Sequence, residues 1–401
     1  MAFADRDGGK ATFSPHLIPA GLAILGIALM AAGMRGPITS VGPLLETIRS
    51  DTGLSATGAG VLSMLPLLAF AAVSPLAPGL AGRIGLERAL GIALGLLAVG
   101  LAVRWIPGAV PLFTGTALLG VAIGLINVLL SALIKRDYQD RAPALTGVYT
   151  TTMGALAMLG SGIAVPVADH APGGWRTSLG LWVIVALIAL AAWVPRLRAA
   201  DQRPPAHRPG SRALRRSRLA WLLTAFMGLQ SLGFYVSVSW LPTILHAHGV
   251  SPAAAGWHVA LVQLTGLLAS AASPLVIARL ADQRLFGAGA AVLGVLSFLG
   301  FVVAPDLSWV WSGTVGLSQG VGITLALSFF ALRARDAGQA AALSGMGQSF
   351  GYLLAALGPL LFGVLHDATG GWGIPLIILA GLIGVQAVVA LGAGRARQLS
   401  G

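Results

Sequence analysis

The chain has 401 residues, of which 56% are hydrophobic and only 9% are charged, whereas about 25% of the residues in an ordinary soluble domain are charged. This composition excludes a water-soluble globular domain. The net charge is +12, and the absence of cysteine excludes disulfide bonds and cysteine-based metal or redox chemistry.

Twelve apolar segments are each long enough for a helix that crosses the hydrocarbon core of a membrane, which requires roughly 20 residues. We predict membrane-spanning helices, in chain order, at residues 17–47, 55–81, 88–106, 111–134, 142–167, 176–195, 219–245, 255–280, 286–304, 309–332, 338–364 and 372–393. The 55 glycines and 22 prolines agree with this prediction, because small residues permit close packing of membrane helices and neighbouring helices tolerate kinks. The sequence therefore predicts an all-α membrane protein with twelve transmembrane helices.

Arg35 lies deep within the first predicted helix, about 18 residues from its start, with no acidic residue nearby in the sequence. An arginine at the centre of a membrane helix costs ~2.5–3.5 kcal/mol on insertion scales, so its side chain is expected to face an aqueous cavity or a partner. We predict that it binds an anion in a central cavity, because the planar guanidinium fork suits an oxyanion or a carboxylate. The alternative is a structural role, in which Arg35 bonds carbonyl or glutamine oxygens. The Gly36-Pro37 step that follows should bend the helix.

Other polar side chains near the middles of the predicted helices are candidate substrate ligands beside Arg35. Thr39 lies one turn further along the same helix face, where its hydroxyl could contact the substrate or bond back to the helix. The other candidates, in chain order, are Asn127, Gln230, Tyr235, Gln263, Gln319, Gln348 and Tyr352. A single buried amide is more often a contact between helices, but the spread of these residues over both halves of the chain favours one site of directional hydrogen bonds.

No acidic residue lies near the middle of a predicted membrane helix, although proton-driven transporters commonly use a carboxylate within the membrane. Glu46, near the outer end of the first helix, is the acid that could border the cavity. His258 could titrate near physiological pH, either as a coupling group or as a plain interface histidine. Trp240 and Trp257 could stack on a planar solute, but aromatic residues at helix ends usually anchor to lipid headgroups, and we assign them that role.

Residues 196–218 contain eight arginines, three prolines and one acid, a composition too polar for the membrane interior. We interpret this segment as a cytoplasmic linker between an N-terminal six-helix bundle, residues 1–195, and a C-terminal six-helix bundle, residues 219–401. Binding of the linker to anionic lipid headgroups is a further option.

The basic residues are distributed unevenly between the two sides of the membrane. With the chain threaded through the twelve predicted helices, 21 of the 25 Lys and Arg residues fall on the side that holds both termini and the linker. Arg49, Arg104 and Arg176 fall on the opposite side, and Arg35 falls within a helix. By the positive-inside rule, we expect a multi-pass protein of the bacterial inner membrane with both termini in the cytoplasm. The distribution of basic residues therefore indicates the orientation of the protein in the membrane and does not indicate nucleic-acid binding.

An internal repeat relates the two halves of the chain at an offset of about 196 to 199 residues. The matching strings, in the same order in each half, are Gly53-Leu54-Ser55 with Gly249-Val250-Ser251, Ser74-Pro75-Leu76 with Ser273-Pro274-Leu275, Ala144–Gly147 with Ala342–Gly345, and Gly173-Gly174-Trp175 with Gly370-Gly371-Trp372. A duplicated six-helix unit with both copies in one orientation creates a cleft between pseudo-symmetric bundles, which can rock about a central site. This arrangement predicts a transporter, because neither a receptor nor a membrane enzyme requires it.

A short charged motif follows the second helix of each half. The two strings are Leu80-Ala81-Gly82-Arg83-Ile84-Gly85 and Leu280-Ala281-Asp282-Gln283-Arg284. They resemble the signature of the major facilitator superfamily, although Gly82 replaces its aspartate in the first half. In that family this turn holds the bundles together on the cytoplasmic side when the transporter faces outward. The resemblance therefore implies a gating role for Arg83, Gly85, Asp282 and Arg284, with a weakened latch in the first half.

Three longer strings resemble the cyanate and 2-nitroimidazole transporter branch of that superfamily. They are Arg35–Leu45 (RGPITSVGPLL), Gly228–Tyr235 (GLQSLGFY) with Trp240-Leu241-Pro242, and Gly345–Tyr352 (GMGQSFGY) with Gly358-Pro359. The resemblance covers nearly the whole chain. It implies the major facilitator fold of two six-helix bundles, and small anionic or planar polar solutes as substrates.

The phosphate-binding motif GxxxxGK[ST] and a metal-spaced set of His, Asp and Glu are absent from the sequence, so we expect no ATP-driven transport, no metal, no cofactor and no enzymatic activity. We expect a monomeric secondary active or facilitated transporter of a small polar solute in the lipid bilayer. The favoured solute is a small anion, cyanate-like, nitrate-like or a small carboxylate, moved by alternating access. The alternative is an exporter of small neutral or cationic drugs such as nitroimidazoles, and a signalling receptor with this fold is a third interpretation.

Overall fold

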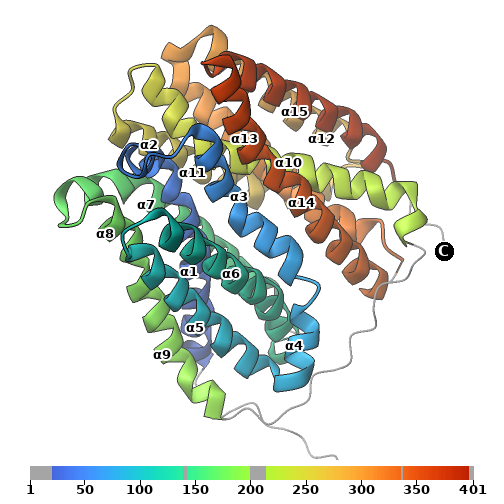
Figure 1. Cartoon of the computed structure of the whole chain (residues 1–401). Helices are drawn as coiled ribbons and strands as arrows, with labels where there is room; N and C mark the ends of the chain where they lie inside the picture. Colours follow the sequence, from blue (N-terminus) through green and yellow to red (C-terminus); the bar gives the residue numbers. More distant parts are fainter. Residues whose placement is uncertain (1–19, 139–141, 199–213, 336, 397–401) are drawn as a thin grey trace, which may run out of the picture.

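The computed structural model describes residues 20–138, 142–198, 214–335 and 337–396, which form α-helices joined by short turns (Figure 1). The helices of the first half are α1 (Ala20–Thr39), α2 (Val41–Thr52), α3 (Ala56–Val73), α4 (Ala77–Ile84), α5 (Leu86–Trp105), α6 (Ala109–Asp137), α7 (Ala142–His170), α8 (Trp175–Gly180) and α9 (Trp182–Arg198). Those of the second half are η2 (Leu214–Arg216), α10 (Arg218–Ala247), α11 (Pro252–Ile277), α12 (Arg284–Val303), η3 (Pro305–Leu307), α13 (Ser308–Leu332), α14 (Ala337–Thr369) and α15 (Gly373–Ala393).

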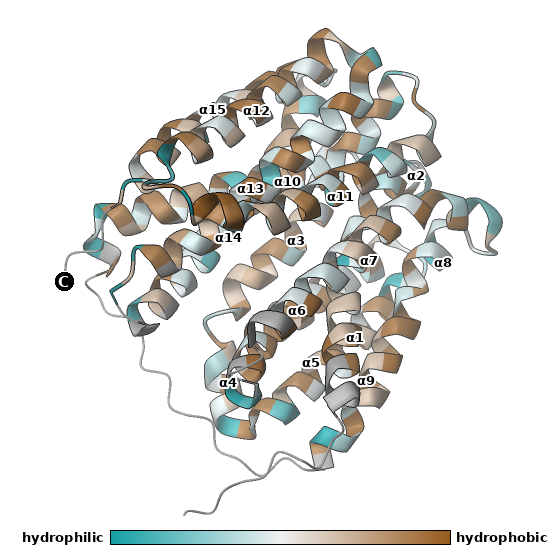
Figure 2. Ribbon diagram, turned by 180° about the vertical axis from the view of Figure 1, so that it is seen from behind, coloured by the Kyte–Doolittle hydropathy of each residue, from teal (hydrophilic) through white to brown (hydrophobic). Residues whose placement is uncertain are grey.

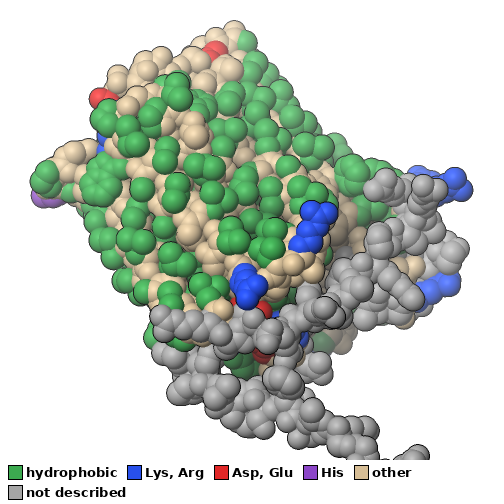
Figure 3. Space-filling view, turned by 60° about the horizontal axis from the view of Figure 1, so that its bottom comes forward, with side chains coloured by type: hydrophobic (Ala, Val, Ile, Leu, Met, Phe, Trp, Pro, Cys, Tyr) green, Lys and Arg blue, Asp and Glu red, His purple; other side chains and the backbone are tan. Residues whose placement is uncertain are grey.

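Eleven segments of the described chain are long and apolar enough to cross a membrane, with α8 and α9 together forming one of them. With α1, they make the twelve membrane helices that the sequence predicts. Figure 3 shows an extended surface of hydrophobic side chains with few charged side chains among them. The prediction of an all-α membrane protein is therefore confirmed.

Three predicted helices contain a break. The first breaks at Ser40, between α1 and α2, three residues beyond Pro37, which has no amide hydrogen to donate to the helix. Similar breaks fall at residues 74–76, between α3 and α4, and at Leu181, between α8 and α9. A break in the helix therefore follows Arg35, where the sequence predicts a bend.

The internal repeat encodes the same turn twice. Gly53 and Gly249 have left-handed φ angles of 70° and 85°, which residues other than glycine rarely adopt. Two residues later, the hydroxyls of Ser55 and Ser251 cap α3 and α11 by accepting backbone amide hydrogens at 3.1 and 3.3 Å. The repeated string therefore builds the sharp turn between the first and second membrane helices of each half.

The two halves meet at one end of the molecule, which we call the far face and which carries the turns at residues 53–55 and 249–251. Here α3 packs on α14, α7 on α11 and α2 on α10. The helices touch backbone to backbone, because a Cβ added to Gly60 would lie 2.6 Å from the carbonyl oxygen of Pro359, and one added to Gly363 would lie 2.4 Å from that of Ala56.

The opposite end, which we call the linker face, carries the end of α9 and the start of α10. Figures 1 and 2 show α4 and the start of α14 diverging toward this face. A Cβ added to Gly82, Gly147 or Gly345 would meet no described atom within 4 Å. The two halves are in contact at the far face and diverge toward the linker face. Residues 199–213, most of the predicted linker, lie outside the described residues, so the bundle boundaries at 195 and 219 stay predictions.

Candidate functional site

Arg35 extends from α1 toward the second half of the molecule. Its guanidinium carbon lies 4.6 Å from the centroid of the Phe234 ring on α10, and the side chain is half-buried. Within the described residues, no hydrogen bond or ion pair joins Arg35 to the protein. The cation–π contact contributes roughly 0.5–2 kcal/mol and uses none of the five N–H donors of the guanidinium. Those donors are left for water or a solute between the halves.

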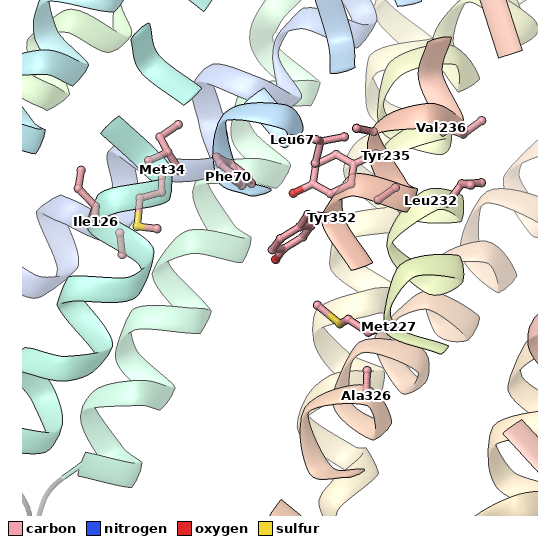
Figure 4. Packing of buried hydrophobic residues seen from close by; sticks show 14 of the residues in the cluster. Met34, Leu67, Phe70, Ile126, Met227, Leu232, Tyr235, Val236, Ala326 and Tyr352 are labelled. Atoms are coloured by element: carbon pink, nitrogen blue, oxygen red, sulfur yellow. The ribbon is translucent and has the colours of Figure 1, made fainter. Parts of the chain in front are cut away.

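Three of the four tyrosines of the chain surround this guanidinium. Tyr149 on α7, Tyr235 on α10 and Tyr352 on α14 are buried, and each lies close enough to Arg35 to interact with its charge. Tyr235 and Tyr352 meet edge to face with ring centroids 6.4 Å apart. Figure 4 shows their hydroxyl ends directed into the space between the two halves. The structure therefore brings the predicted residues Arg35, Tyr235 and Tyr352 together.

The first half supplies the opposite wall of this site. The Tyr149 hydroxyl donates to Oδ1 of Asn127 on α6 at 2.7 Å, so the predicted residue Asn127 belongs to the same cluster. Phe70 on α3 packs edge-on against Tyr352, with ring centroids 5.7 Å apart (Figure 4). Sequence reasoning missed Phe70, Tyr149 and Phe234, because phenylalanine is ordinary in membrane helices. The rarity of tyrosine is the signal that could have indicated Tyr149.

Thr39 and Arg104 support the bend next to Arg35. Thr39 is fully buried, and its hydroxyl donates to the carbonyl oxygen of Ala157 on α7 at 3.0 Å. Arg104, expected on the outer side of the membrane, is buried at the end of α5 and donates to the carbonyl oxygen of Pro37 at 3.2 Å. Both side chains hold α1 against its neighbours, and neither faces the space between the halves in this conformation.

The glutamine candidates divide between two regions. Gln263 on α11 is buried with no partner for its amide nitrogen, and lies on the helix face whose Gly256 approaches Ser161 of α7. Gln348 on α14, one turn before Tyr352, donates to the Ser344 hydroxyl at 3.1 Å. Gln263 therefore lies at the contact between the halves.

Gln230 and Gln319 line a small pocket together with Gln386 and residues of α12. Gln230 donates to the Ser231 hydroxyl at 2.7 Å, and Gln319 donates to the Ser237 hydroxyl at 3.0 Å. All residues that line this pocket come from α10, α12, α13 and α15. The structure therefore brings these two glutamines together within the second half, apart from the wall that the first half supplies.

The residues assigned to gating lie near the linker face. Arg83 is exposed on α4, and Gly85 ends that helix with a φ of 91°. Asp282 pairs with Arg284 at 3.0 Å in the turn before α12, so this ion pair lies within one half. In the described residues, no hydrogen bond or ion pair across the halves involves Arg83, Asp282 or Arg284, and the gating role of the four residues stays a prediction.

Trp240 corrects one expectation. Its side chain is 0% exposed, its indole donates to the carbonyl oxygen of Pro359 at 2.9 Å, and it packs on Trp372, so the role of headgroup anchor is wrong for Trp240. Trp257 is 46% exposed, as an anchor would be.

Both ring nitrogens of His258 have hydrogen-bond partners. These partners are the Ala254 carbonyl oxygen and the Ser308 hydroxyl, an environment that fits an interface histidine.

Among the described residues, Arg35 has no protein acceptor and lies between two halves that are in contact at one face, an arrangement that fits a membrane transporter of small solutes. The chain belongs to the Major Facilitator Superfamily, whose family model matches residues 22–356. It is a multi-pass membrane protein and a transporter, not an enzyme.

Two curated relatives and one solved structure agree with this assignment. The chain is 43% identical to the 2-nitroimidazole transporter of Escherichia coli (strain K12) over 381 residues, which cover 94% of this chain and 96% of that protein. It is 29% identical to the cyanate transport protein of the same strain over 368 residues, which cover 90% and 95%. A crystal structure of a D-xylose-proton symporter matches with a TM-score of 0.78 at 14% identity, covering 94% of this chain and 99% of that one, which shows the shared fold. The predicted branch of the superfamily is confirmed.

Proposed function

We propose that this protein carries a small anion, cyanate-like, nitrate-like or a small carboxylate, by alternating access. The proposal depends on the Arg35 guanidinium, which meets no protein acceptor among the described residues and lies over the Phe234 ring of the other half. A fork of N–H donors binds a delocalised negative charge directionally. Tyr235 and Tyr352 add hydroxyl donors, and the rings of all three tyrosines add flat surfaces that favour a small planar solute.

Orientation in the membrane is part of this proposal. The sequence places 21 of the 25 Lys and Arg residues on the side of the predicted linker, so by the positive-inside rule the linker face is the cytoplasmic side of a bacterial inner membrane. The halves then diverge toward the cytoplasm, and in this proposal a solute reaches Arg35 from that side. Because the chain has no cysteine, single cysteines at the exposed residues Asp306 and Arg395 test this orientation. An impermeant thiol reagent added to intact cells should label Asp306→Cys and not Arg395→Cys, and the reverse pattern would reject it.

The second candidate is export of nitroimidazole-type drugs. The 43% identity to a 2-nitroimidazole transporter favours it, and the two oxygens of a nitro group also match the guanidinium fork. Aromatic walls suit a heterocyclic ring. The absence of a mid-depth carboxylate from the predicted helices is an argument against a cationic drug.

Uptake assays in proteoliposomes that contain the purified protein distinguish the two candidate functions. We expect uptake of labelled cyanate or nitrate, loss of that uptake in Arg35→Gln, and weak uptake in Arg35→Lys, which keeps the charge but not the fork. Arg88→Gln, at an exposed arginine of α5, is the matched control and should transport normally. Unimpaired anion uptake by Arg35→Gln would reject the role of Arg35, and flux of 2-nitroimidazole alone would favour the second candidate.

A further inference from the structure

A separate pocket lies at the far face, between the two halves. It has a volume of ≈ 140 Å³ and is lined by Pro43, Glu46, Thr47 and Ser50 of α2, Pro242, Thr243 and His246 of α10, and Pro252 and Ala255 of α11. Its floor, which includes Pro43, Pro242 and Thr243, is buried, whereas Glu46 and His246 at the rim are exposed. A water molecule occupies about 30 Å³ of liquid, so the pocket has room for a small organic molecule.

The polar groups of this pocket are mainly acceptors. The Thr243 side chain is 7% exposed, and its hydroxyl has no hydrogen-bond partner, which is costly for a buried polar atom. His246 directs Nδ1 to the carbonyl oxygen of Val250 at 3.1 Å, so in the neutral ring Nε2 is left as an acceptor. The Glu46 carboxylate bonds Arg49 through one oxygen at 2.9 Å, and its other oxygen is not used by that ion pair.

We infer that this pocket is a second binding site, and that it takes a small planar cation with N–H donors, such as guanidinium or imidazolium. The Glu46 carboxylate supplies the opposite charge, and the free acceptors of His246 and Thr243 match N–H donors. The rings of Pro43 and Pro242 form an apolar floor on which a flat ion can lie. The site is opposite in charge to the one around Arg35, so the two sites select different ligands.

Occupancy of this site has a consequence for transport. Its lining comes from α2 of the first half and from α10 and α11 of the second, so the site is complete only while the far face is closed. A ligand shifts a conformational equilibrium by its differential affinity for the two states. A cation bound here therefore holds the far face closed and lowers the maximal transport rate without competing at Arg35.

Binding is tested by calorimetry on the full-length protein in nanodiscs, with millimolar guanidinium chloride as the probe. Saturable binding is expected, and tetramethylammonium chloride, a cation without N–H donors, should not bind. Glu46→Gln and Thr243→Val should each weaken guanidinium binding by about threefold to tenfold. Arg49→Gln should strengthen it, because this substitution releases the carboxylate from its ion pair.

Two further variants locate the site. Asp306→Asn removes an exposed acid at the far face that belongs to the second half and does not line the pocket. This variant should leave guanidinium binding unchanged. Arg35→Ala should also leave it unchanged, so failure of the transport proposal and failure of this one give different results. Absence of saturable binding, equal binding by Glu46→Gln, or loss of binding in Arg35→Ala would overturn the inference.

The effect on transport is measured in proteoliposomes. Guanidinium added on the side of the far face should lower the maximal transport rate at constant KM, and a rise in KM alone would contradict the proposed closure.

Discussion

Arg35 and Phe234 belong to opposite halves of the molecule and meet at the central site, with the guanidinium carbon 4.6 Å from the ring centroid. In the proposed alternating-access mechanism the two halves rock about a central site, so this contact crosses the boundary along which movement is expected. It restrains the guanidinium without using its hydrogen-bond donors. A solute can therefore bind those donors while the protein keeps the charge in place.

Removal of the Phe234 ring should weaken solute binding. We expect Phe234→Leu to raise KM by about threefold to thirtyfold, the range that corresponds to a cation–π contact of about 0.7–2 kcal/mol, while the protein still inserts and folds. Phe350→Leu, at an exposed phenylalanine of α14 that packs on Trp221, is the matched control. Transport assays over a range of solute concentrations measure the change, and an unchanged KM in Phe234→Leu would show that the ring is not part of the site.

The hydrogen bond between Tyr149 and Asn127 should contribute measurably to the affinity for the transported solute. Tyr149→Phe removes one hydroxyl and keeps the ring, so we expect KM to rise by about threefold to tenfold, the equivalent of about 1 kcal/mol. Asn127→Ala should have a similar effect, and the double variant should lose little more than either single one, since the two groups share one bond. Tyr138→Phe, whose hydroxyl contacts Arg196 near the linker face, should transport normally. Fully additive losses would mean that the two side chains act separately.

Hydropathy made the twelve helices predictable, because a segment in lipid must be apolar over a known length. Arg35 was predictable for the related reason that a lone charge at that depth requires an aqueous or polar environment. The breaks at Ser40 and Leu181 were harder to place, since a short interruption changes neither length nor hydropathy. Pro37 indicated the first of them.

Contacts between the halves could not be predicted in the same way. Phe70 and Phe234 look like ordinary lipid-facing residues in the sequence, and only the approach of α3 and α10 to the central space gives them a role. The glutamines show the opposite problem, because Gln263 lies at the contact between the halves whereas Gln319 lies inside the second half. Both environments avoid lipid, so the pattern of hydropathy does not distinguish them.

The close contact of α3 with α14 should control closure of the far face. Gly363→Ala places a methyl group 2.4 Å from the Ala56 carbonyl oxygen, so the helices must move apart. Gly381→Ala, at a glycine of α15 whose added Cβ meets nothing within 4 Å, is the matched control. We expect Gly363→Ala to lengthen the spin-label distance between cysteines introduced at the exposed residues Val110 and Leu307. Unchanged distances would show that the crossing of α3 and α14 does not hold the far face closed.

Arg333 should stabilise the second half at the linker face. It is 4% exposed and donates to the side-chain oxygen of Gln283 at 2.6 Å and to the carbonyl oxygens of Ala393 and Gly394 at 3.3 and 3.1 Å, so it joins the ends of α12, α13 and α15. Arg333→Met keeps most of the volume but leaves those oxygens without this donor, at a cost of about 2 kcal/mol.

Arg335 provides the comparison for this substitution, because it lies two residues further along and is exposed. Thermal unfolding in detergent should show a Tm several degrees lower for Arg333→Met, and a Tm close to that of the parent for Arg335→Met, since surface substitutions usually change stability by less than about 0.5 kcal/mol. Solute affinity should stay the same in both variants, because neither side chain belongs to the site around Arg35. Equal melting temperatures for the two variants would mean that Arg333 does not tie these helix ends together.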